Sequence, residues 1–172
     1  MTPELNVGIL LNELFVDTVR VSLPLFRPEL CLVATIVLLL LCRMLPLLRY
    51  LDSGGIALGG VCFAAWYAFV DFLSIGSQMG DALLPADAVR NELFGGLLVF
   101  DSFTAFLRLV LAGFLVLYVV LTKLSGIPDR EDGADFYSLV LGSSLGMCLM
   151  VSANNLLMVF MAIEMASVPS YV

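Results

Sequence analysis

The sequence predicts an all-α, multi-pass membrane protein with about five transmembrane helices. Hydrophobic residues make up 61% of the 172 residues and charged residues only 13%, whereas soluble domains carry about 25% charged residues. The long apolar runs also lack the polar stripe that a soluble helix shows every third or fourth residue. These observations favour a chain that lies in a lipid bilayer over a soluble helical bundle.

Composition excludes several other classes of function. The net charge is −7, and the eight Lys and Arg residues are scattered, so no basic patch for nucleic acid is expected. The chain has no His, the commonest general base and metal ligand. The four cysteines lie in or beside apolar runs without metal-site spacing, so we expect no metal site, no cofactor-binding residues and no disulfides.

The first segment, residues 1–28, is predicted to be interfacial or flexible. Glu13, Asp17 and Arg20 share one face of a short amphipathic helix, which suits the membrane surface. The acidic residues and the lack of a basic start argue against a signal peptide. Pro28 then interrupts the chain before the first long apolar run.

Residues 29–122 are predicted to hold the first three transmembrane helices, at about 29–48, 54–75 and 93–121. Arg43 is expected at the far end of the first helix, where a long side chain reaches the headgroups. Gly60 and Ala64 have the small-xxx-small spacing that permits close helix packing. Residues 77–92 are read as a polar connection.

The third predicted helix carries Asp101 near its start and Arg108 seven residues later. Both lie on one helix face, about 10 Å apart along the axis, which is too far for direct pairing. Each is expected by default to pair structurally with a neighbouring helix or to reach the membrane surface. The functional alternative is a charge network that feeds a proton path.

Two further segments complete the chain. Residues 123–135 form the most hydrophilic stretch and are predicted to be a surface loop. Residues 136–172 are predicted to form a helical hairpin with helices at about 136–151 and 155–172. The turn is expected at Ser152-Ala-Asn-Asn155, because Asn tolerates left-handed backbone and caps the following helix.

Glu164 is the only charged residue between Phe136 and the last residue. A carboxylate at the centre of a membrane helix costs at least ~2.5 kcal/mol, and such residues mark ion paths and proton relays. Ser167 lies on the same helix face, and Pro169 removes a helix hydrogen bond just beyond. Glu164 is therefore a candidate proton-handling acid; a neutral, hydrogen-bonded packing residue is the alternative.

The last two predicted helices carry a specific sequence pattern. Phe136-Tyr-Ser-Leu is followed by Gly146-Met, Ser152-Ala-Asn-Asn-Leu, and Glu164-Met-Ala-Ser-Val-Pro-Ser-Tyr171. This pattern resembles the antiporter-like subunits of respiratory complex I, the proton-pumping NADH–quinone oxidoreductase, and most closely its N subunit. The segment from Leu93 through Asp101 to Arg108 is similar to the family's segment that enters a helix.

The resemblance implies a function and a set of partners. The chain would be the N-terminal part of a longer antiporter-like helix bundle, with Glu164 as its proton-path acid and Ser167, Pro169, Asp101 and Arg108 as accessory candidates. As a non-redox subunit it would couple quinone reduction to proton translocation without activity alone. NADH, flavin, Fe–S clusters and quinone would be bound by partner subunits, and the remaining contacts would be other membrane subunits and lipid.

The resemblance also implies a bacterial cytoplasmic membrane, and a four-to-three excess of Lys and Arg in alternate connections places the N-terminus outside. Two other functions stay open. One is a subunit of a related multi-component cation/proton antiporter or membrane-bound hydrogenase. The other is a small membrane scaffold or assembly protein, in which Glu164 only anchors a partner helix.

Overall fold

The computed structural model describes residue 16 and residues 18–45, 52–81, 90–126 and 133–171. Residues 1–15 and Asp17 of the predicted N-terminal segment, and about half of each predicted polar connection, therefore lie outside the described residues. The elements in chain order are a π-helical turn η1 (Thr18–Ser22), α2 (Leu23–Leu25), α3 (Arg27–Met44), α4 (Ser53–Asp81), β1 (Asn91–Leu93), β2 (Leu98–Phe100), α5 (Ser102–Ser125), α6 (Gly133–Ser152), α7 (Leu156–Ser167) and a 3₁₀ turn η3 (Val168–Ser170).

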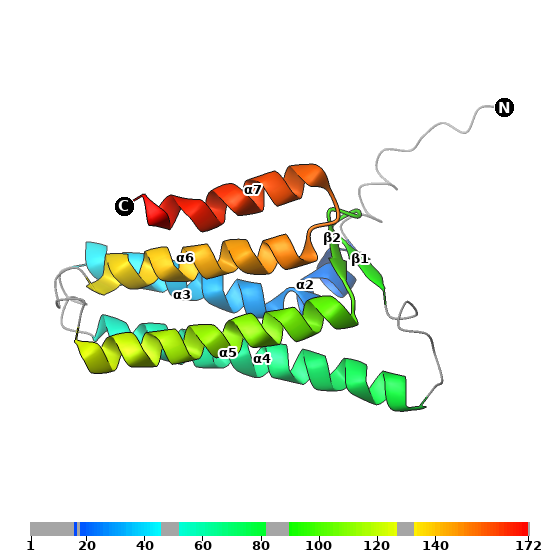
Figure 1. Ribbon diagram of the computed structural model, residues 1–172, viewed down its shortest axis with the longest axis horizontal. Helices are drawn as coiled ribbons and strands as arrows, with labels where there is room; N and C mark the ends of the chain where they lie inside the picture. The colour runs from blue at the N-terminus through cyan, green and yellow to red at the C-terminus, as the bar shows by residue number, and fades with distance from the viewer. Residues whose placement is uncertain (1–15, 17, 46–51, 82–89, 127–132, 172) are drawn as a thin grey trace.

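The long helices run side by side along the molecule, and α7 lies along the outer side of α6 (Figure 1). The short β-hairpin sits at the end of the bundle where α2 leads into α3. The main helix contacts join α4 to α5, α3 to α4, α3 to α6 and α6 to α7. Helices α3 to α6 thus form the bundle, and α7 is attached to its edge through α6.

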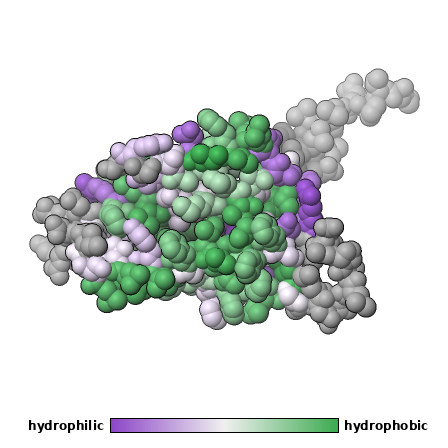
Figure 2. Space-filling view, in the orientation of Figure 1, coloured by the Kyte–Doolittle hydropathy of each residue, from purple (hydrophilic) through white to green (hydrophobic). Residues whose placement is uncertain are grey.

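The prediction of a helical, multi-pass membrane protein is confirmed. Within the described residues, three helices are long and apolar enough to cross a membrane: Ser53–Gly76 of α4, then α5 and α6. The number rises to four if Thr18–Leu25 and Arg27–Met44, which meet at 77°, form one span. Hydrophobic residues cover much of the helical surface in Figure 2, as a lipid-facing protein requires.

Helix α7 has only 12 residues, whereas a span needs about 20. The predicted helix at 155–172 is therefore a shorter α-helix that continues as the 3₁₀ turn η3. The predicted cap is confirmed: the Asn155 side chain accepts a hydrogen bond from the Leu157 N–H at 3.1 Å. The backbone of Asn155 is extended, with φ of −127°, and not left-handed. Asn154 ties this turn to the β-hairpin by donating to the Gly96 carbonyl at 3.0 Å.

The third predicted helix starts later than expected. The apolar run from Leu93 suggested a helix, but the structure has a hairpin that pairs Leu93 with Leu98. Its turn places Phe94, Gly95 and Gly96 at φ of 53°, 67° and 85°, a left-handed backbone that interrupts a helix and favours glycine. Asp101 then caps α5, with its carboxylate accepting from the Thr104 N–H at 2.7 Å.

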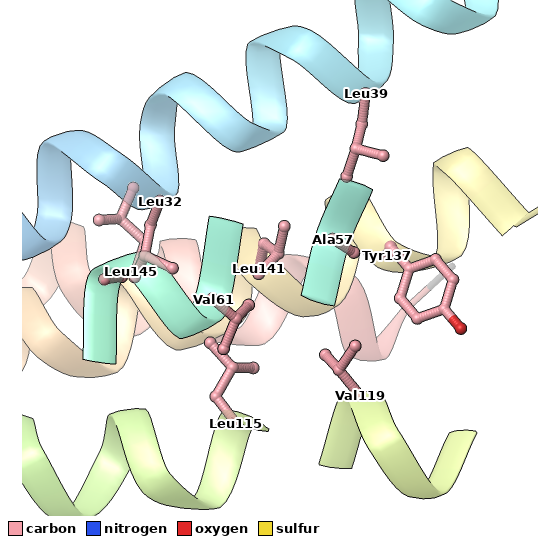
Figure 3. Packing of buried hydrophobic residues seen from close by; sticks show 10 residues of the cluster. Leu32, Leu39, Ala57, Val61, Leu115, Val119, Tyr137, Leu141 and Leu145 are labelled. Carbon is pink, nitrogen blue, oxygen red and sulfur yellow. The ribbon is translucent and has the colours of Figure 1, made fainter. Parts of the chain in front are cut away.

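The apolar core lies between α3, α4, α5 and α6, and its side chains converge in Figure 3: Leu32, Leu39, Ala57, Val61, Leu115, Val119, Tyr137, Leu141 and Leu145. Helices α3 and α4 approach most closely at Gly60. A Cβ atom there would lie 2.0 Å from the hydroxyl oxygen of Thr35. A larger residue than glycine would therefore meet Thr35 at this position.

Polar groups pair at the end of the bundle opposite the hairpin. Arg43 at the end of α3 forms an ion pair with Asp135 at the start of α6. Lys123 near the end of α5 donates to Asp52, just before α4, at 2.7 Å. The hydrogen bond from Lys123 lowers the pKa of Asp52 below its usual value. These partly exposed pairs join the helix ends without burying charge.

Candidate functional site: charged residues within the helices

A buried ion pair joins the first and third long helices. Nε of Arg108 on α5 lies 2.8 Å from Oε1 of Glu29 on α3, and the two side chains are only 3% and 1% exposed. Arg108 is six residues into α5 and therefore about 9 Å along it. Each buried charge is stabilised by its partner, because a buried charge without a partner costs several kcal/mol. The pair thus fixes α5 against the start of α3.

The hairpin end of the bundle encloses this ion pair. Nη1 of Arg108 donates to the carbonyl of Leu25 in α2 at 3.2 Å. The guanidinium also lies 5.3 Å from the centre of the Phe100 ring on β2, a favourable cation–π arrangement. Phe100 is buried with Leu93 and Leu98 of the same hairpin. The unpredicted β-hairpin therefore helps to cover the charges.

Several polar atoms of the pair remain without a hydrogen bond. Among the described residues, neither Oε2 of Glu29 nor Nη2 of Arg108 has a partner, and the close Oε1–Nε contact lacks hydrogen-bond geometry. Both side chains line a cavity of about 20 Å³, together with Ser144 and Cys148 of α6. A cavity of this size has the volume of about one water molecule, but the surface that faces it is apolar.

Asp71 on α4 adds a second acid beside the pair. Val61, Ala64 and Ala68 line the same cavity, and Asp71 follows at the helical spacing that keeps it on their face. The side chain is partly buried, and its Oδ2 is buried without a hydrogen-bond partner among the described residues. The positive charges of Arg108 and Arg27 both attract the negative charge of this carboxylate.

Sequence analysis identified only one member of this cluster. Arg108 was expected to pair with a neighbouring helix, and it does so with Glu29. Asp101, the other predicted member of a charge network, instead caps α5 through Thr104. Asp71 carried a usable signal, because it is a lone acid within a predicted apolar span. Glu29 gave little signal, since a Glu directly after a proline is common in the first turn of a helix.

Glu164 lies on the exposed side of α7. Ala162 is the buried residue of this helix, 1% exposed, and Glu164 follows two residues later, about 200° further around the axis. Large apolar side chains beside it, including Phe160, Met161 and Ile163, are also exposed. Glu164 thus projects from a largely apolar surface rather than into the bundle.

The accessory residues predicted near Glu164 act on the backbone. Ser167 donates its hydroxyl hydrogen to the main-chain carbonyl of Glu164 at 3.1 Å. Pro169 lies within the 3₁₀ turn η3, directly after the last residue of α7. Because proline has no N–H, it cannot continue the α-helical hydrogen bonds. These residues shape the end of the helix that carries Glu164.

The position of Glu164 is set by close contact between α6 and α7. At Gly146 a Cβ atom would lie 2.7 Å from the backbone nitrogen of Ala166 and 3.0 Å from the carbonyl oxygen of Ala162. One helix turn earlier, Ser143 donates to the carbonyl of Ala166 at 2.9 Å. The backbone on both sides of Glu164 therefore rests on a glycine and a serine of α6.

Comparisons with known proteins identify subunits N of NADH-quinone oxidoreductase as relatives. The chain is 34% identical over 156 residues, 88% of its length, to NADH-quinone oxidoreductase subunit N 2 of Sorangium cellulosum, of which the match covers 29%. Two subunits of Symbiobacterium thermophilum are each 33% identical: subunit N 1 over 90% of this chain and 28% of the relative, and subunit N 2 over 68% and 22%. No protein-family model and no solved structure matches.

These matches confirm the resemblance to subunit N that the sequence pattern predicted. The similarity extends along most of the chain and is not confined to the pattern around Glu164. The chain spans less than a third of the length of these curated relatives.

Proposed function

We propose that this chain is part of a membrane subunit of NADH–quinone oxidoreductase, in which Glu164 is an acid of the proton path. The observation that carries the proposal is the 34% identity to a subunit N over 88% of the chain, together with the charge at Glu164 in an otherwise apolar helix. The chain itself would move protons, whereas NADH, flavin, Fe–S clusters and quinone would be bound by other subunits.

The surroundings of Glu164 support a role that involves a partner. A carboxyl group among exposed apolar side chains is unfavourable in lipid, where charged groups generally face protein or water. The same surface, covered by further protein that carries a cation near Glu164, would hold the carboxylate in its charged form. Withdrawal of that cation would favour proton uptake, so a change in distance between the two charges would bind or release a proton.

The cellular setting follows from the same proposal. The chain would lie in the cytoplasmic membrane of a bacterium, with its N-terminus outside, and would contact the other membrane subunits of the complex. In this setting the exposed apolar surfaces of the helices would contact lipid or neighbouring subunits. The close packing of α7 on α6 would keep Glu164 at a fixed place relative to the bundle.

The test is Glu164→Gln in the chromosomal gene, assayed in membrane vesicles. Glutamine keeps the size of the side chain but binds no exchangeable acid proton. We expect normal amounts of assembled complex and a loss of NADH-driven proton uptake of about tenfold or more, consistent with the 10²–10⁴-fold contribution of a positioned acid.

Glu92→Gln is the matched control, because Glu92 is an exposed acid on strand β1, outside the apolar helices. This variant should pump like the wild type. Normal pumping by an assembled Glu164→Gln complex would overturn the assignment of Glu164. Loss of assembly in both Glu164→Gln and Glu164→Asp would favour an anchoring role in a scaffold.

A further inference from the structure

We propose that Glu29, Asp71 and Arg108 form a second proton-binding site inside the helical bundle, where one exchangeable proton resides on Asp71. Its part in proton movement rests on the proposed function above. The existence of the site is independent of that function, because it is inferred from the geometry and charge of these three residues.

The first argument is the balance of charge. Glu29 and Asp71 are both acids. Arg108 is the buried cation, it contacts Glu29, and a guanidinium does not lose its proton in proteins. With both acids ionised the cluster would carry a net charge of −1 in a largely buried place. Buried charges without compensation usually become neutral by binding a proton. One proton on a carboxylate brings the cluster to zero.

The second argument assigns the proton to Asp71. Glu29 is the acid that contacts Arg108, at 2.8 Å, and contact with a cation favours the ionised form. The buried Oδ2 of Asp71 has no hydrogen-bond partner among the described residues. Neutralising this oxygen removes the larger part of the cost of burying it. Proton binding is a simple transfer, in which hydronium gives its proton to Asp71 and leaves water.

Of the other described groups that face the cluster, Arg27 carries the one further charge. They are the carbonyl of Leu25 from α2, Arg27 and Cys31 from the start of α3, and Cys148 from α6. The two thiols are neutral near pH 7. Arg27 is exposed, so water and salt screen its charge more strongly than that of the buried Arg108.

Infrared difference spectroscopy of the purified complex tests the proposal directly. The spectrum of Asp71→Asn is subtracted from that of the wild type at pH 7, in H₂O and in D₂O. We expect the loss of one protonated-carboxyl C=O band that shifts on deuteration. The matched control is Asp52→Asn, whose exposed acid is ionised because Lys123 lowers its pKa; it should remove carboxylate absorption and no protonated-carboxyl band.

Assembly of the variants provides an independent readout. Asparagine mimics a protonated aspartic acid in size and charge, so Asp71→Asn should assemble normally. Glu29→Gln leaves Arg108 without its counter-charge and should reduce the amount of complex severalfold or more. An unchanged carboxyl band in Asp71→Asn, or loss of the band in Glu29→Gln instead, would overturn the proposal, and so would failure of Asp71→Asn to assemble. These readouts are separate from the pumping assay for Glu164.

Discussion

The contact between Gly146 and the backbone of α7 gives the sharpest test of how this helix is held. In Gly146→Ala, the new Cβ would lie 2.7 Å from the Ala166 nitrogen. Ordinary contact begins near 3.4 Å, so α6 and α7 must move apart by about 0.7 Å. The obstacle is backbone, so no change of side-chain rotamer relieves it.

The expected cost follows from this geometry. Overpacking of this kind costs about 1–3 kcal/mol, which corresponds to roughly 5- to 150-fold in an equilibrium between attached and detached α7. Separation would also lengthen the 2.9 Å hydrogen bond from Ser143 to the Ala166 carbonyl. The new Cβ would also lie 3.0 Å from the carbonyl oxygen of Ala162, the buried residue of α7.

Hydrogen exchange measured by mass spectrometry, on the purified protein in lipid nanodiscs, resolves the opening of α7 from that of the bundle. The matched control is Gly142→Ala, four residues earlier on α6, where an added Cβ meets no atom within 4 Å. Both variants gain the same helix propensity, about 1 kcal/mol at most. We expect faster exchange of α7 in Gly146→Ala alone; equal exchange in the two variants would refute the close-contact argument.

Two further outcomes are expected elsewhere in the bundle. Gly60→Ala should destabilise the packing of α3 on α4 by about 1–3 kcal/mol, because its Cβ would lie 2.0 Å from the Thr35 hydroxyl oxygen. In thermal unfolding, the double variant Gly60→Ala/Thr35→Ala should recover part of the lost stability. No recovery of stability would contradict this packing. The Asp52–Lys123 pair should contribute less than about 1 kcal/mol to the free energy of unfolding. This contribution is fully present above the usual pKa of Asp and is lost as the pH falls through the lowered pKa of Asp52. Lys123→Met should abolish this acid-dependent part of the stability.

Much of the helical architecture could be predicted because it depends on local apolar runs. The turn at Asn155 was also predictable from local sequence, because its cap is a hydrogen bond to the Leu157 N–H only two residues away. The hairpin before α5 was missed because Leu93 and Leu98 are apolar and continue the hydrophobic run. The adjacent Gly95 and Gly96 were the available signal for a turn.

The charged sites depend more on tertiary contacts. Arg108 was recognised as a residue that needs a partner, but its partner Glu29 lies on another helix and is chosen by packing alone. Glu164 was recognised as an unusual intramembrane acid from the apolar residues around it. Its exposure on α7 could not be predicted from spacing, because several faces of this helix are apolar and periodicity does not say which one contacts α6.

The central proposal is tested most directly by the number of protons moved per NADH oxidised. This ratio is measured in vesicles that contain the assembled Glu164→Gln complex. This ratio separates proton transfer from the rate of electron transfer, which partner subunits would carry out. We expect the ratio to fall while the complex remains assembled, and Glu92→Gln to keep the wild-type ratio. An unchanged ratio in Glu164→Gln would contradict the role of Glu164 in the proton path.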